Sequence, residues 1–173
     1  MDLLHEGFNA IDPFIRSYGL LALFFLIYFE SLGLPLPGET ALLGAVALAY
    51  EGQLPIVGVF LVVVIAAVLG DKTGYLIGRH GGRPLMARFG RIVGLTPQRQ
   101  AWIESLYATH GSIIVVGARF VVVLRQLNGV VAGSMNMRWP LFLAGNVIGA
   151  VLWTSVWSFG PYLVGHVVRG SLH

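Results

Sequence analysis

The sequence predicts an all-α polytopic membrane protein with one domain, built from two units that each combine a broken helical hairpin with one transmembrane helix. Of 173 residues, 56% are hydrophobic and only 11% are charged, whereas soluble domains carry about 25% charged residues. Two apolar runs have only 11 residues each, about half of the ~20 that cross a bilayer as a helix. Because each unit crosses once, the second is inverted relative to the first, a design found in transporters.

The first unit begins after residues 1–17, whose mixed polarity predicts an interfacial segment and whose acidic residues argue against a signal peptide. Residues 18–54 are expected to form a re-entrant hairpin with arms at 19–29 and 40–50. Proline removes a backbone donor and glycine loosens a helix, so the break between the arms is assigned to Gly33, Pro35, Pro37 and Gly38.

A transmembrane helix is predicted over 55–79, and the chain then becomes basic. Three glycines at four-residue spacing form a stripe that would let another helix approach closely: Gly70, Gly74 and Gly78. Five arginines within residues 79–99 predict a cytoplasmic side for region 80–111. Within it, residues 84–92 have the pattern of a basic amphipathic helix on the membrane surface, and an ordinary cytoplasmic loop is the alternative.

The second unit repeats this order. Residues 112–137 are apolar but interrupted by charged and polar residues, so they predict a second re-entrant hairpin, with its break at Gly129 and Gly133 after the turn signal Asn128-Gly129. Residues 138–160 predict the second transmembrane helix, and 161–173 a short tail. A homo-oligomer is compatible with this pattern.

Charged residues inside the hairpins indicate a site, because a charge at membrane depth is costly. Arg119 and Arg125 are six residues apart and Glu30 and Glu39 nine apart, so neither pair converges on a straight helix. With breaks between them, the arginines and Asn128 would form a phosphate site, since guanidinium groups bind phosphate bidentately. Alternatively, the arginines pair with Glu30 and Glu39 and only hold the hairpins together.

Acidic residues are candidates for proton coupling in this cavity: Glu30, Glu39, Glu51 and Asp71. For Asp71, a salt bridge with Arg79 is the favoured alternative. The five histidines lack metal-ligand spacing, and no metal site or cofactor is expected. No positioned nucleophile and base appear, which argues against an enzyme. The arginines are dispersed around apolar segments, which favours membrane lipids over nucleic acid as partners.

Three motifs, "FESLGLPLPGE", "GDKTGYLIGR" and "GARFVVVLRQLNGVVAGS", resemble the DedA family of bacterial inner-membrane proteins, also called SNARE-associated or VTT-domain proteins. The resemblance covers roughly residues 15–165 and implies two facing re-entrant hairpins, with acidic positions at Glu39 and Glu51 and paired arginines at Arg119 and Arg125. This chain departs from the family pattern at Val122, Val123 and Val131, where Pro-Gly and proline are usual.

The function that the resemblance implies is return of undecaprenyl phosphate across the bacterial inner membrane, with dependence on the proton motive force. Together with the acidic and basic hairpins, it leads us to expect a flippase-like, proton-coupled transporter of a lipid phosphate such as this polyprenyl phosphate. A proton-coupled exporter of small solutes or ions and a phospholipid scramblase are the alternatives.

Overall fold

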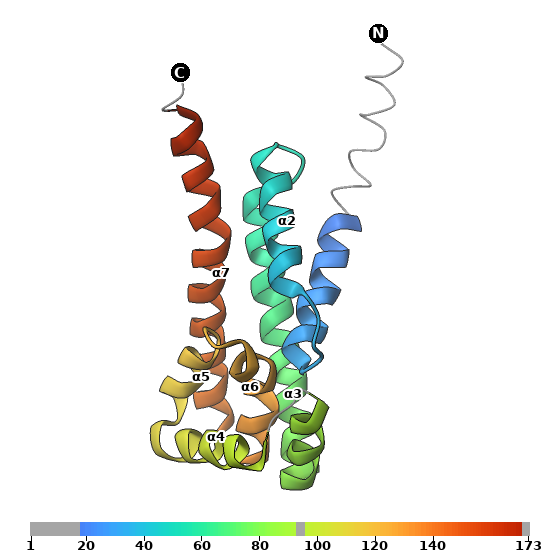
Figure 1. Cartoon of the computed structure of the whole chain (residues 1–173), viewed down its shortest axis with the longest axis vertical. Helices are drawn as coiled ribbons and strands as arrows, with labels where there is room; N and C mark the ends of the chain where they lie inside the picture. Colours follow the sequence, from blue (N-terminus) through green and yellow to red (C-terminus); the bar gives the residue numbers. More distant parts are fainter. Residues whose placement is uncertain (1–17, 93–95, 171–173) are drawn as a thin grey trace.

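The computed structural model describes residues 18–92 and 96–170, and every regular element in these ranges is an α-helix (Figure 1). The predicted interfacial segment 1–17 lies outside the described residues. In chain order the helices are Tyr18–Leu32, α2 Gly38–Tyr50, α3 Ile56–Ile92, α4 Pro97–His110, α5 Ser112–Ala118, α6 Val122–Ser134 and α7 Trp139–Gly170. The prediction of an all-helical chain is therefore confirmed for the described part.

The first two helices form an antiparallel pair (Figure 1). Residues 33–37 separate them and are not helical, as expected for a segment with two prolines. Gly33 has a φ of 119°, in the region that only glycine adopts without strain, and its N–H donates to the carbonyl of Glu30 at 3.0 Å. The local chemistry of this segment therefore explains where the chain reverses.

Two helices are long and apolar enough to cross a membrane, Ile56–Gly81 and Trp139–Leu163. The predicted spans 55–79 and 138–160 agree with these two spans to within three residues at each end, but both helices continue beyond the spans. α3 continues through Pro84 to Ile92, so residues 84–92 are not a separate helix, and α7 continues through Pro161 to Gly170 instead of ending in a short tail. Helices of membrane proteins tolerate an internal proline because local adjustment satisfies the carbonyls that it leaves without a donor.

The predicted break at Gly129 and Gly133 is wrong, because both residues lie inside α6. The interruption of this unit lies earlier, at residues 119–121 between α5 and α6. A Cβ added at Gly129 would lie 2.2 Å from the Asp71 carbonyl oxygen, and one at Gly133 would lie 2.0 Å from that of Tyr75. These glycines therefore serve close contact between α6 and α3, as glycines do in membrane helix pairs.

The glycine stripe on α3 faces two partners. A Cβ at Gly78 would lie 2.1 Å from the carbonyl oxygen of Val130 on α6, whereas one at Gly70 would lie 2.4 Å from the carbonyl oxygen of Tyr28 on the first helix. The prediction that this stripe admits a close neighbour is confirmed. α3 is thus the central helix, with the first helix on one part of its length and α6 on the other.

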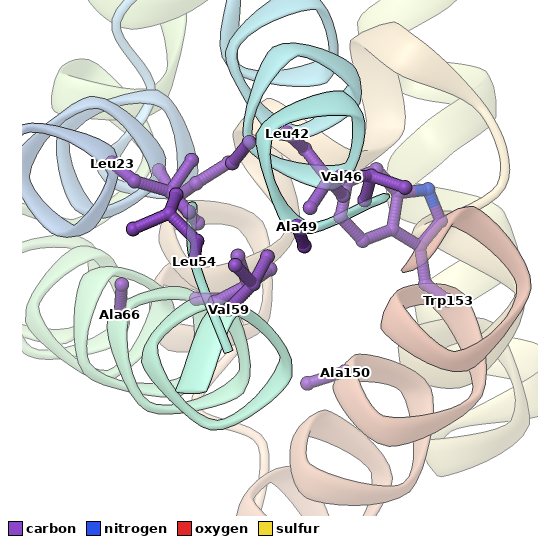
Figure 2. Packing of buried hydrophobic residues seen from close by; sticks show 13 residues of the cluster. Leu23, Leu42, Val46, Ala49, Leu54, Val59, Ala66, Ala150 and Trp153 are labelled. Atoms are coloured by element: carbon purple, nitrogen blue, oxygen red, sulfur yellow. The ribbon is translucent and has the colours of Figure 1, made fainter. Parts of the chain in front are cut away.

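Two apolar clusters hold these helices together. One joins the first helical pair, α3 and α7, and Figure 2 shows Trp153 of α7 reaching Leu42 and Val46 of α2. The other surrounds Tyr75 of α3 and joins it to α5, α6 and the start of α7. Large apolar side chains remain exposed along one stripe of α3, at Leu61, Ile65 and Leu69, which is the pattern of a helix that faces lipid.

Candidate functional site

Arg125 on α6 is the centre of a buried ionic cluster that joins three helices. Its Nη2 donates to Oε1 of Glu30 on the first helix at 2.7 Å, and its Nη1 donates to Oε1 of Glu39 on α2 at 2.5 Å. The two carboxylates lie on opposite sides of the break at 33–37, and the reversal brings both to one guanidinium group. We call Glu30, Glu39 and Arg125 the Arg125 cluster.

Two further groups position this cluster. The guanidinium of Arg125 lies 4.8 Å from the centre of the Trp153 ring on α7, within the range of a cation–π interaction. The carboxylate of Glu30 lies against the first residue of α2, since a Cβ at Gly38 would be 2.1 Å from Glu30 Oε2. Glu30 therefore occupies the positive end of the α2 dipole, a place that suits an anion.

Access to the Arg125 cluster is unequal. The side chains of Arg125 and Glu30 are almost completely buried, whereas 37% of the Glu39 side chain is exposed. The Nε of Arg125 is buried and has no hydrogen-bond partner among the described residues. One guanidinium donor is thus unused, and one of the two carboxylates can reach solvent.

Arg119 belongs to a different ion pair, which corrects two expectations. It pairs with Asp71 on α3, and both side chains are 1% exposed. Arg79, the partner that the sequence suggested for Asp71, instead donates to the Tyr75 hydroxyl at 2.6 Å. The prediction that both arginines meet Glu30 and Glu39 in one cavity is therefore wrong for Arg119 in this structure.

Asn146 of α7 completes the Arg119–Asp71 pair. Its Oδ1 accepts from Arg119 Nη2 at 2.6 Å and its Nδ2 donates to the Val68 carbonyl at 3.3 Å. The bond to Val68 joins α7 to α3. Asp71 Oδ1 and Arg119 Nε have no partner among the described residues.

Asn128 has both ends of its amide occupied. Its Oδ1 accepts from the Tyr107 hydroxyl at 2.5 Å, and its Nδ2 donates to the Val115 carbonyl at 3.2 Å. Burial raises the pKa of the Tyr107 phenol, so that hydroxyl keeps its proton and acts as the donor. These contacts join α4, α5 and α6, and Asn128 also lies close to Asp71, so it belongs to the buried polar network around the Arg119–Asp71 pair.

Glu51 lies away from both ionic groups, against the expectation of a shared acidic cavity. It follows the last residue of α2, whereas Glu39 is in the first turn, so about 18 Å of helix separates them at 1.5 Å per residue. Its carboxylate is exposed and accepts from Gln53 Nε2 at 2.9 Å. Among the described residues, no group of three His, Asp or Glu side chains is placed to hold a metal ion.

Trp153 and Tyr107 are site residues that the sequence reasoning missed. Tryptophans usually lie at membrane–water interfaces. Trp153 instead lies in the middle of an uncharged span. This unusual position could have indicated that its ring contacts a polar group inside the membrane. Tyr107 offered no such signal, since it lies in an ordinary polar helix.

Residues 36–163 match the VTT domain family, which is most of the chain and includes Glu39 and both buried arginines. The chain belongs to this family. It is similar to the DedA protein of Escherichia coli K12, with 32% identity over 95% of this chain and 78% of that protein. It is also similar to an uncharacterized membrane protein of Synechocystis, with 37% identity over 92% of this chain and 73% of that protein.

The chain is also similar to an uncharacterized membrane protein of Mycobacterium bovis, with 39% identity over 79% of this chain and 64% of that protein. This chain thus spans somewhat less than two thirds of the mycobacterial protein. No solved structure matches the present chain. Family membership and the two apolar spans together identify a membrane protein.

Proposed function

We propose that this protein moves a lipid phosphate, such as undecaprenyl phosphate, across the bacterial inner membrane. The observation that carries the proposal is the Arg125 cluster: one buried arginine held by two carboxylates from either side of a helix break, one of them partly exposed. In this proposal the carboxylates balance Arg125 in the empty state, and a phosphate replaces them when the lipid enters. Arg125 also has an unused Nε donor, which a phosphate with several acceptor oxygens would engage.

The topology proposed for this function is multi-pass with two re-entrant elements. The helices Tyr18–Leu32 and α2 have 15 and 13 residues, so each extends only about 20 Å at 1.5 Å per residue, short of the ~30 Å hydrocarbon core. α5 and α6 have 7 and 13 residues, and the non-helical residues 119–121 separate them. We propose that both pairs enter and leave on the same side, as an inverted repeat, and that their charged residues meet inside the membrane.

Proton coupling follows from the charge balance of the same cluster. Two carboxylates and one guanidinium carry one net negative charge when all are ionised. A phosphate entering there adds more negative charge, so a carboxylate must take up a proton or move into water. Glu39 is the group able to move into water, since its side chain is the exposed one.

Lipid binding by arginine variants tests the proposal. The comparison is polyprenyl phosphate against uncharged polyprenol, in detergent. Arg125→Gln is expected to weaken binding of the phosphate by roughly 2 kcal/mol or more, because an ionic hydrogen bond in a desolvated site is lost. Arg125→Lys should also bind it less tightly, since lysine lacks the fork geometry. Binding of polyprenol should not change in either variant.

The matched control is Arg138→Gln, since Arg138 is an exposed arginine outside both ionic groups. Arg119 and Asn128 were predicted as phosphate ligands, and Arg119→Gln and Asn128→Ala extend the assay to them. If Arg125→Gln remains monodisperse and binds the phosphate as tightly as the parent, Arg125 only holds helices together and the proposal fails.

A further inference from the structure

An apolar groove runs between the first helix and α2, and its lining residues do not include those of the Arg125 cluster. It has a volume of about 270 Å³ and is lined by apolar side chains and by small residues of both helices: Gly19, Ala22, Leu23, Leu26, Ala41, Gly44, Ala45, Leu48 and Leu54. The volume is close to the lower limit of about 300 Å³ for ligand pockets. It therefore fits a segment of one lipid chain and not a whole lipid.

The groove ends close to the Arg125 cluster on both helices. Its lining on the first helix ends at Leu26, and Glu30 continues the same face one turn further, about 6 Å along the axis. On α2 the lining begins at Ala41, one turn after Gly38, which the carboxylate of Glu30 contacts. The charged cluster thus stands at one end of a hollow that is otherwise apolar.

Two glycines of the groove have no packing role in the structure. A Cβ added at Gly19 or Gly44 would meet nothing within 4 Å, in contrast to Gly78 or Gly133, where it would meet backbone at 2.1 and 2.0 Å. Glycine inside a helix costs about 1 kcal/mol relative to alanine. Here the small residues leave open the space that a chain segment would fill.

We propose that this groove binds the second and third prenyl units of the hydrocarbon tail of the lipid whose phosphate binds Arg125. The inference rests on the proposed function, because the phosphate site determines which end of the lipid enters the groove. A negatively charged headgroup at Arg125 and an apolar chain along Leu26, Ala45 and Leu48 match an amphipathic ligand at both ends. The chemistry selects a single-chain lipid phosphate over a free phosphate ion, which would leave the groove unused.

The experiment fills the groove from each wall. Gly44→Leu and Gly19→Leu place a side chain in the hollow from α2 and from the first helix, and Gly160→Leu is the control. Gly160 is also a helical glycine whose Cβ would meet nothing within 4 Å, but it lies on α7 outside the groove. The probes are farnesyl phosphate, which has a long tail, and dimethylallyl phosphate, which has a short one.

The parent is expected to prefer the long-tailed probe. Both groove variants should reduce that preference by about tenfold, the effect of excluding roughly two methylene groups from an apolar site. Their affinity for the short-tailed probe should not change, and Gly160→Leu should behave as the parent. Because the two groove variants are independent, the test still holds if one of them misfolds. Each variant is checked for monodispersity.

The outcomes separate this inference from the proposed function. If both groove variants keep the parent's preference for the long tail while Arg125→Gln weakens both probes, the phosphate site stands and the groove inference is overturned. If the groove variants instead change the oligomeric state, the groove is a contact between copies of the chain and the inference is equally wrong. If Arg125→Gln binds both probes as the parent does, the proposed function itself fails.

Discussion

Neutralising Asp71 tests whether its pairing with Arg119 stabilises the protein. Both side chains are 1% exposed, and within the described residues Asn146 is the other hydrogen-bond partner of the guanidinium group. Asp71→Asn keeps the shape of the side chain but leaves a buried guanidinium without a counter-charge. Breaking one partner of a buried pair costs about 3–5 kcal/mol, so we expect Asp71→Asn and Arg119→Gln each to destabilise by that amount.

The double variant Asp71→Asn/Arg119→Gln gives the decisive comparison. It leaves no buried charge, and two amides can still bond to each other, so most of the loss should be recovered. Replacing a buried ion pair by neutral groups is often close to neutral for stability. The two single effects should therefore be strongly non-additive, whereas independent sites add within about 0.3–0.5 kcal/mol.

Thermal unfolding in detergent, followed by tryptophan fluorescence, measures these effects. At about 2–4 °C per kcal/mol for a chain of this size, each single variant should lower the Tm by roughly 6–20 °C. The matched control is Arg138→Gln, which removes an exposed arginine and should leave the Tm unchanged. Additive losses in the double variant, or single losses below about 1 kcal/mol, would refute the buried pair.

Three further predictions concern other parts of the structure. Gly78→Ala should lower the stability measured by thermal unfolding by about 1–3 kcal/mol, because the new Cβ would overlap the Val130 carbonyl on α6. Gly44→Ala places its Cβ in open space and should cause no loss. Equal effects of the two variants would contradict the close packing of α3 on α6. Tyr75→Phe should cost about 1–3 kcal/mol, since its hydroxyl donates to the Met137 carbonyl at 2.5 Å and accepts from Arg79; an unchanged Tm would show that neither bond stabilises the fold. Glu39→Gln should strengthen binding of polyprenyl phosphate by removing a competitor for Arg125, while Glu51→Gln should leave it unchanged; a binding assay that gives the reverse order would place Glu51 and not Glu39 at the site.

Local sequence features predicted the first break and the central helix well. Pro35 and Pro37 cannot continue a helix, because each lacks a backbone donor wherever the chain lies. The glycine stripe of α3 likewise predicted a close neighbour, although not which one, and the structure has two. One of the two alternatives for the charged residues was that both arginines pair with Glu30 and Glu39, and the structure joins Arg125, but not Arg119, to these carboxylates.

The same reasoning failed where one residue type serves two purposes. Gly129 and Gly133 fit a turn and a close helix contact equally well, and only the presence of α3 beside them selects the contact. Asp71 lies eight residues before Arg79, so a local partner was reasonable, yet it pairs with Arg119, 48 residues away. The position of Glu51 was also misjudged, because its distance from Glu39 depends on α2 being one straight helix.

The sequence by itself determined that this chain is an α-helical membrane protein and where the chain breaks between its first two helices. These properties depend on composition and on the backbone chemistry of single residues. Only the tertiary structure decided that Arg125 meets Glu39 and Glu30 across 86 and 95 residues while Arg119 meets Asp71. Any of the carboxylates suits either arginine chemically, and the choice is made by the close packing of α6 on α3 and by the face of α7 that supports each guanidinium group.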